Sequence, residues 1–225
     1  MAIRLAAICF EAHRPRELAA FWGGLLGWKA GDDPLRLVPE DDAGVPVWFA
    51  PAEEAKVEHN KIHFDLTSGS AEEQRGLVER ALELGGRPCD VGQKGDEGHV
   101  VLADPEGNEF CVIEPGNNFL AGCGRVGAIN CDGSRALGYF WSEALGWPLV
   151  WDQDEETAIQ SPYGGTKITW SGPPVSPRVG KDLFLAVAVD GAADVDRLVK
   201  LGAGRVDDRT MTDPDGNKFS VLTRP

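Results

Sequence analysis

Two residues far apart in the chain are of types that could do chemistry, His63 and Cys111. His63 lies in a run of alternating apolar and polar residues, 61–66, which is typical of a strand with one covered face. Histidine titrates near neutrality, so His63 could act as a general acid or base, or it could simply hydrogen-bond a neighbour. Cys111 lies between Glu109 and Glu114, whose charges disfavour a thiolate, so a small buried side chain is the favoured interpretation of it.

Aromatic residues are the second group of candidates. Phe49 and Trp170 end two short predicted strands, and Trp48 precedes the first of them. Such positions can line a cleft that holds a flat or apolar ligand, and they can equally pack in a core. We therefore predict a ligand site formed by Trp48, Phe49, His63, Cys111 and Trp170, with packing as the alternative for the aromatic residues.

The segments that must position these residues belong to an internal sequence repeat. The segment 104–114, DPEGNEFCVIE, returns at 213–222 as DPDGNKFSVL, and FWGGLLGW at 21–28 returns as FWSEALGW at 140–147. Proline, glycine and asparagine in this order are typical of a turn that leads into a strand. A repeat of about 110 residues predicts two related domains.

The expected boundaries follow from composition. We predict domain 1 at 1–116, a linker rich in glycine and asparagine at 117–124, and domain 2 at 125–225. Each half begins with a strand and a helix, followed by short strands, and then repeats that plan. The second copy is shorter between its last helix and the Asp-Pro turn, so we expect it to be the degenerate one. The helices are predicted at 15–26, 71–84, 134–145 and 192–201.

Composition limits the classes of partner. The net charge is −14, and residues 1–116 carry 11 basic and 22 acidic side chains against 11 and 14 in residues 117–225. This field disfavours nucleic acid and anionic membranes, and it favours a cationic small molecule if a charged ligand binds; an acidic surface that only keeps the protein soluble is the alternative. Five cysteines without CxxC pairs argue against a disulfide framework or a structural zinc site. No apolar run would span a bilayer, and we expect a cytoplasmic protein.

These motifs resemble the vicinal oxygen chelate superfamily, and most closely the glyoxalase-like domains that include bleomycin-resistance-type proteins. The Phe-Trp pair before Leu-Gly-Trp, the strand with His63 and the run DPEGNEFCV carry the resemblance. It implies an α+β fold of four βαβββ units, forming two tandem domains with curved mixed sheets. Two such domains would mimic the dimer of single-domain relatives, so the chain is expected to be a monomer with an internal pseudo-dimer, or a homodimer.

The resemblance also implies metal-ligand positions on the first and last strands of each unit. His63 and Cys111 occupy the two in the second unit; the others fall at residues that bind no metal or bind it poorly, near Ala7, Phe49, Ala128, Trp170, Phe184 and Ser220. No cofactor is therefore predicted. If a divalent metal binds, His63 and Glu114 are the expected ligands, with Asp65 as another nearby oxygen donor.

Two functions remain open. The leading prediction is a small-molecule-binding protein with a metal-poor cleft, which sequesters an aromatic or cationic compound such as an antibiotic, or which uses His63 in acid/base chemistry without a metal. The alternative is a metal-dependent lyase, isomerase or dioxygenase. Whether the chain is an enzyme is left undecided by its sequence.

Overall fold

The structure is a computed structural model, and it describes residues 3–40, 44–95, 97–172 and 182–223. Four helices and sixteen strands lie in these ranges, arranged as four successive βαβββ units. This confirms the predicted α+β glyoxalase-like class. No helix in the described part of the chain is long and apolar enough to cross a membrane.

The first half contains units 1 and 2. Their elements are β1 (Arg4–Ala12), α1 (Pro15–Leu26), β2 (Lys29–Ala30), β3 (Arg36–Val38), β4 (Val47–Pro51), β5 (Ile62–Leu66), α2 (Ala71–Glu83), β6 (Arg87–Pro88), β7 (Val100–Ala103) and β8 (Glu109–Val112). Helix α1 begins at a proline and ends at Gly27, which has φ of 74°. Helix α2 begins after Ser70, whose hydroxyl accepts from the Glu73 N–H.

The second half contains units 3 and 4. Their elements are β9 (Val126–Asp132), α3 (Arg135–Leu145), β10 (Leu149–Gln153), β11 (Glu156–Gln160), β12 (Lys167–Ser171), β13 (Leu183–Val189), α4 (Ala192–Leu201), β14 (Gly204–Arg205), β15 (Thr210–Thr212) and β16 (Lys218–Thr223). The four predicted helices are confirmed to within one residue at each end. The shorter second copy keeps all three strands after α4, so what it lacks is loop.

The sheets do not follow the halves. One eight-stranded sheet has the order β14-β15-β16-β13-β1-β4-β3-β2 and joins unit 4 to unit 1; the other has the order β10-β11-β12-β9-β5-β8-β7-β6 and joins unit 3 to unit 2. We call them sheet 1–4 and sheet 2–3. Their central pairs, β1 with β13 and β5 with β9, are antiparallel. Each sheet therefore needs one unit from each half of the chain.

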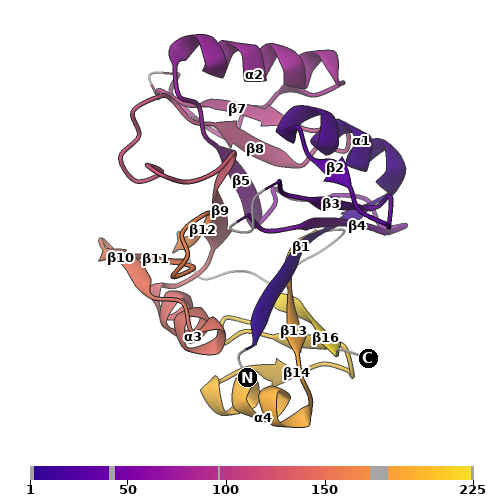
Figure 1. Ribbon diagram of the computed structural model, residues 1–225, viewed down its shortest axis with the longest axis vertical. Helices are drawn as coiled ribbons and strands as arrows, with labels where there is room; N and C mark the ends of the chain where they lie inside the picture. Colours follow the sequence, from indigo (N-terminus) through magenta and orange to yellow (C-terminus); the bar gives the residue numbers. More distant parts are fainter. Residues whose placement is uncertain (1–2, 41–43, 96, 173–181, 224–225) are drawn as a thin grey trace.

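Helices α1 and α2 lie at one end of the molecule and α3 and α4 at the other (Figure 1). One hydrophobic cluster runs through both halves and contains the inward-facing residues of both sheets together with the apolar stripes of the helices. Within the first half five aromatic residues meet in this core: Phe10, Trp22, Phe49, Phe64 and Phe110. Burial of a ring of this size stabilises the fold by roughly 1.5–3 kcal/mol.

Candidate functional site

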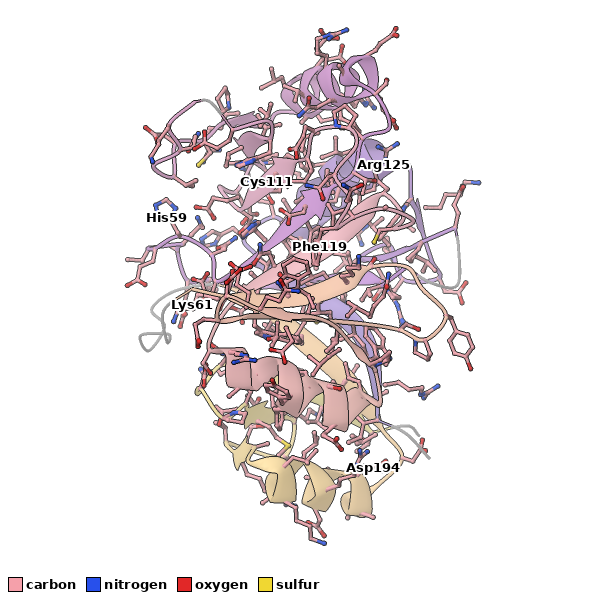
Figure 2. All side chains as sticks on the ribbon, turned by 90° about the vertical axis from the view of Figure 1, so that its left-hand side faces the viewer. His59, Lys61, Cys111, Phe119, Arg125 and Asp194 are labelled. Atoms are coloured by element: carbon pink, nitrogen blue, oxygen red, sulfur yellow. The ribbon has the colours of Figure 1, made fainter. Side chains whose placement is uncertain are left out.

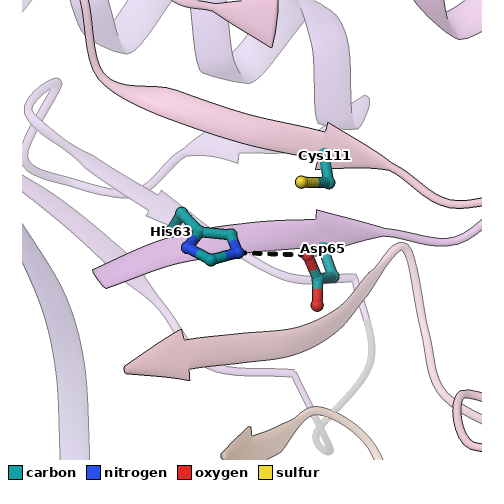
Figure 3. Close-up of side chains that lie close together, drawn as sticks. All are labelled: His63, Asp65 and Cys111. Atoms are coloured by element: carbon teal, nitrogen blue, oxygen red, sulfur yellow. Dashed lines mark ion pairs between the residues drawn. The ribbon is translucent and has the colours of Figure 1, made fainter. Parts of the chain in front are cut away.

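Three polar side chains meet on the face of sheet 2–3 that is turned away from the core. His63 and Asp65 lie on β5 two residues apart, so both point to the same side, and Cys111 on β8 is in register with Asp65. Their nitrogen, oxygen and sulfur donor atoms all lie within 4.8 Å of one another. The side chains converge in Figure 3. We call this group the β5–β8 triad.

His63 and Asp65 of the triad are close but not hydrogen-bonded. His63 Nε2 lies 3.6 Å from Asp65 Oδ1, which is longer than a hydrogen bond. The His63 side chain keeps 30% of its surface exposed and that of Asp65 only 15%. The imidazole is therefore accessible to a small molecule, while the carboxylate is held beneath it.

Burial sets the protonation of the other two members. It raises the pKa of Asp65, an effect that the nearby His63 and His99 and hydrogen bonds from Cys111 and Asn130 partly offset. Burial and the Asp65 charge together raise the pKa of the Cys111 thiol well above its usual range. The raised thiol pKa disfavours the thiolate, so Cys111 is a poor nucleophile in this geometry.

Unit 3 adds polar groups without adding a metal ligand. Across β9 and β12, Asn130 and Thr169 continue the row that begins at His63, and Ala128 and Lys167 continue the row of Asp65. Thr169 Oγ1 is buried and has no hydrogen-bond partner within the described residues. The sheet therefore offers donors and acceptors beside the triad for a ligand to use.

The linker packs beside this row. Lys167 Nζ donates to the Phe119 carbonyl oxygen and lies 4.5 Å from the centre of the Phe119 ring. That ring meets Trp151 edge to face, and it packs with Cys111 against a small apolar cluster that includes Ala128. Phe119 and Cys111 lie on the same side of the molecule in Figure 2. The Phe119 ring thus lies next to Cys111 of the triad, on a linker that was not among the predicted site residues.

The structure does not bring the predicted aromatic residues to this site. Phe49 is fully buried against Phe10. Trp48 is half-buried on the other sheet, where it pairs with Cys9 and faces away from the core. Trp170 is 1% exposed and stacks on Trp141. Of the five predicted residues, only His63 and Cys111 come together. Phe49 packs in the core, which was the alternative to lining a cleft.

Two of the ligand positions inferred from the resemblance were displaced by one residue. On β4 the side chain that shares a face with Cys9 belongs to Trp48, not Phe49. On β12 the side chain that shares a face with Asn130 belongs to Thr169, not Trp170. Because strand side chains alternate, a shift of one residue exchanges the outer face for the core. The corrected positions still provide no strong metal ligand.

Glu114, the second ligand expected for a bound metal, lies outside the triad. It follows β8 and accepts a hydrogen bond from Asn117 Nδ2 in the linker. Asp65 takes the place expected for it, because Asp65 is on the same strand face as His63 whereas Glu114 is three residues beyond Cys111.

The comparisons with known proteins agree with this architecture. A family model described as a glyoxalase-like domain matches residues 7–113 and 127–222. The chain belongs to the glyoxalase-like domain family, within the vicinal oxygen chelate superfamily. No curated protein matches it significantly.

Solved structures show the same fold at low sequence identity. Glyoxalase I from Zea mays is 15% identical, with a TM-score of 0.65 over 99% of this chain and 92% of that one. A putative dioxygenase from Bacillus subtilis subsp. subtilis str. 168 is 16% identical, with a TM-score of 0.60 over 99% of this chain and 85% of that one. At this identity the likeness shows the fold alone, so any chemistry has to be inferred from the residues of the triad.

Proposed function

We propose that this chain is a metal-dependent, glyoxalase-like enzyme that acts on an oxygen-bearing small molecule at the β5–β8 triad, as a lyase, isomerase or dioxygenase. The observation that carries the proposal is the convergence of His63, Asp65 and Cys111 within 4.8 Å. It favours the metal-dependent enzyme over the metal-poor binding protein, because Asp65 supplies a carboxylate ligand beside His63.

The His63–Asp65 pair of the triad is spaced for a divalent ion of the zinc type. Bonds of about 2.0–2.3 Å to a tetrahedral ion place two ligand atoms roughly 3.3–3.8 Å apart. His63 Nε2 and Asp65 Oδ1 are 3.6 Å apart, inside that range and outside the range of a hydrogen bond. A set of one nitrogen, one oxygen and one sulfur suits Zn²⁺ better than Mg²⁺ or Ca²⁺. A cation would also compensate the desolvated carboxylate and favour the Cys111 thiolate.

The residues around the triad would hold and orient the substrate. An ion bound there supplies Lewis-acid polarisation of a carbonyl or hydroxyl oxygen. Asn130 and the Thr169 hydroxyl, which has no partner in the described part of the chain, lie in the next strands and can bind the rest of a polar substrate. The Phe119 ring can cover a flat or apolar part of it. These contacts support a small substrate with both polar and apolar parts.

Metal analysis tests the proposal. Protein purified without chelator should retain about one equivalent of a divalent transition metal, and Asp65→Asn, His63→Ala and Cys111→Ala should each lose most of it. Matched controls are His13→Ala, in the exposed loop before α1, and Cys123→Ser, in the linker; both should keep the metal. Wild-type protein without metal after incubation with Zn²⁺, Ni²⁺, Fe²⁺ and Mn²⁺ would refute the assignment.

A second function is favoured by one observation of its own. The accessible His63 imidazole beside the buried Asp65 carboxylate is an arrangement that supports proton transfer without a metal, or the binding of a cation. In this case the protein binds an aromatic or cationic compound and sequesters or modifies it. Tryptophan fluorescence quenching across cationic glycopeptides and planar aromatic compounds tests this, and metal-free protein that responds to none of them would exclude it.

We further propose that the protein is a cytoplasmic monomer. Each sheet already combines a unit from each half, so one chain supplies both partners that a single-domain relative would take from a second copy. Light scattering coupled to size-exclusion chromatography should therefore give a mass near 24.2 kDa. A mass of twice that value would support the homodimer instead.

A further inference from the structure

The two halves of the chain pack their cores differently at corresponding positions. In the first half Phe10 pairs with Phe49, and in the second Cys131 pairs with Trp170. The antiparallel partners agree with this equivalence, because Phe10 faces Leu183 and Cys131 faces Ile62. The same offset relates Phe64 to Leu185. Two phenylalanine rings of the first half are thus replaced by a thiol and an isobutyl group in the second.

The first-half core is filled by these rings. Phe10 lies 5.4 Å from Trp22 and 5.4 Å from Phe64, measured between ring centres. In the second half Trp170 is larger than its counterpart Phe49 and stacks parallel to Trp141 at 6.5 Å, which returns part of the lost volume. Beside these residues lies a cavity of about 570 Å³, lined by Cys131, Trp141, Leu185 and Phe219 together with the Asp-Pro turn at 213–217.

A buried polar group marks this cavity as more than a packing defect. In the first half Trp22 Nε1 donates to Asp104 Oδ2 at 3.1 Å. Trp141 holds the corresponding place on α3 and is 1% exposed, yet its Nε1 has no partner among the described residues, Asp213 included. An unsatisfied buried N–H costs roughly 1–3 kcal/mol. Because Trp141 lines the cavity, a ligand atom there could accept this hydrogen bond.

The lining of the cavity carries more carboxylates than cations. Glu54, Asp207, Asp213 and Asp215 belong to it with three further acidic residues, against the lysines Lys61 and Lys218. Asp215 accepts from the Ser134 N–H and hydroxyl at the start of α3, and Asp213 accepts from Asn217, so both are held in place by the fold. A ligand that fills a cavity lined by aromatic rings and an excess of carboxylates should be apolar at one end and cationic at the other.

We propose that the cavity between β9, α3, β13 and β16 is a second small-molecule site, specific for an aromatic amine that carries a hydrogen-bond acceptor on its ring. The ring would lie against Trp170 and Phe219, the acceptor would take the Trp141 N–H, and the ammonium group would lie among the lining carboxylates. His63, Asp65 and Cys111 do not line this cavity. The site therefore stands independently of the metal proposed for the triad.

The test uses three small probes of one shape on the full-length chain. These are 4-methoxybenzylamine, 4-methoxybenzyl alcohol and 4-methoxybenzoate, titrated by calorimetry and by ¹H-¹⁵N NMR. The amine should bind, the alcohol should bind at least threefold more weakly, and the benzoate should not bind. Shifted resonances should include the indole N–H of Trp141 and not that of Trp22.

Variants taken from the first half supply the controls. Cys131→Phe and Leu185→Phe each restore a ring that the first half already accommodates, so both should fold and should weaken amine binding by tenfold or more. Trp141→Phe removes only the N–H donor and should weaken it about tenfold, the equivalent of one buried hydrogen bond. Trp22→Phe should leave the affinity unchanged. Far-UV circular dichroism checks that each variant is folded.

Two results would overturn the proposal. One is no binding of the amine to wild type at millimolar concentration. The other is binding that Cys131→Phe, Leu185→Phe and Trp141→Phe all leave intact, which would place the amine elsewhere. Equal binding of amine, alcohol and benzoate would remove the assignment to a cation. None of these results depends on whether the triad retains a metal.

Discussion

The pair Trp22 and Trp141 allows the energy of one buried hydrogen bond to be isolated. Both indoles lie at corresponding places in repeated helices, and both are fully buried. Replacing each with phenylalanine removes the same atoms, and Trp22, which packs among rings where Trp141 lines the cavity, should lose at least as much packing. The hydrogen bonding adds to this difference, because Trp22 Nε1 donates to the Asp104 carboxylate, whereas Trp141 Nε1 has no partner within the described chain.

The difference can be estimated from these contacts. A hydrogen bond to a charged group contributes roughly 1.5–3 kcal/mol, and removing an unpaired buried donor costs nothing in hydrogen bonding. Asp104 would keep the bonds from the Asn108 and Glu106 backbone N–H groups and from the Asn108 amide, so the turn itself should survive. We expect Trp22→Phe to lower the free energy of unfolding by about 1.5–3 kcal/mol more than Trp141→Phe does.

Urea denaturation followed by far-UV circular dichroism measures this difference without added ligand. Each sheet combines both halves, so a single cooperative transition is expected and the midpoints can be compared directly. Equal losses in the two variants, or a larger loss for Trp141→Phe, would show that the indole N–H of Trp141 is satisfied. That result would also remove the main support for the second binding site.

Two further predictions concern packing and charge. Gly138→Ala in α3 should cost about 1–3 kcal/mol, because a Cβ there would clash with the Thr157 hydroxyl. Gly76→Ala in α2 meets nothing within 4 Å and should gain up to about 1 kcal/mol. Thermal unfolding compares the two variants, and equal effects would contradict the packing. The Arg125 hydrogen bond lowers the pKa of Glu73, so Glu73→Gln should cost under about 1 kcal/mol at pH 7, and this cost should shrink as the pH falls through the folded-state pKa. A urea-denaturation difference as large at pH 3 as at pH 7 would contradict this.

Much of the fold could be predicted because its signals are local. Helix α1 starts at a proline, ends at a glycine and has apolar residues at spacings of three and four, and each of these features acts within a few residues. The short strands β2, β6 and β14, two residues each, carry no such pattern and were not predicted. Their backbone groups pair only because a longer neighbour is already in place.

The candidate site was predicted only in part, for a physical reason. His63 could be selected from its residue type and the alternation of its strand, and Asp65 shares that alternation. The end of a short strand is less well determined, and there an error of one residue exchanged Trp48 for Phe49 and Thr169 for Trp170. A propensity pattern does not state which residue lies opposite another, since register depends on the neighbouring strand.

The sequence by itself determined the duplication, the four βαβββ units and the lack of ligands at positions such as Ala7 and Ala128. Only the tertiary structure decided that unit 1 pairs with unit 4 and unit 2 with unit 3, that Asp65 and Cys111 close around His63, and that a cavity opens beside Cys131. The first group of properties follows from residues near one another along the chain. The second group depends on contacts between residues far apart along the chain, such as those that pair β1 with β13. Such contacts depend on how the packed elements fit together, which a local pattern does not specify.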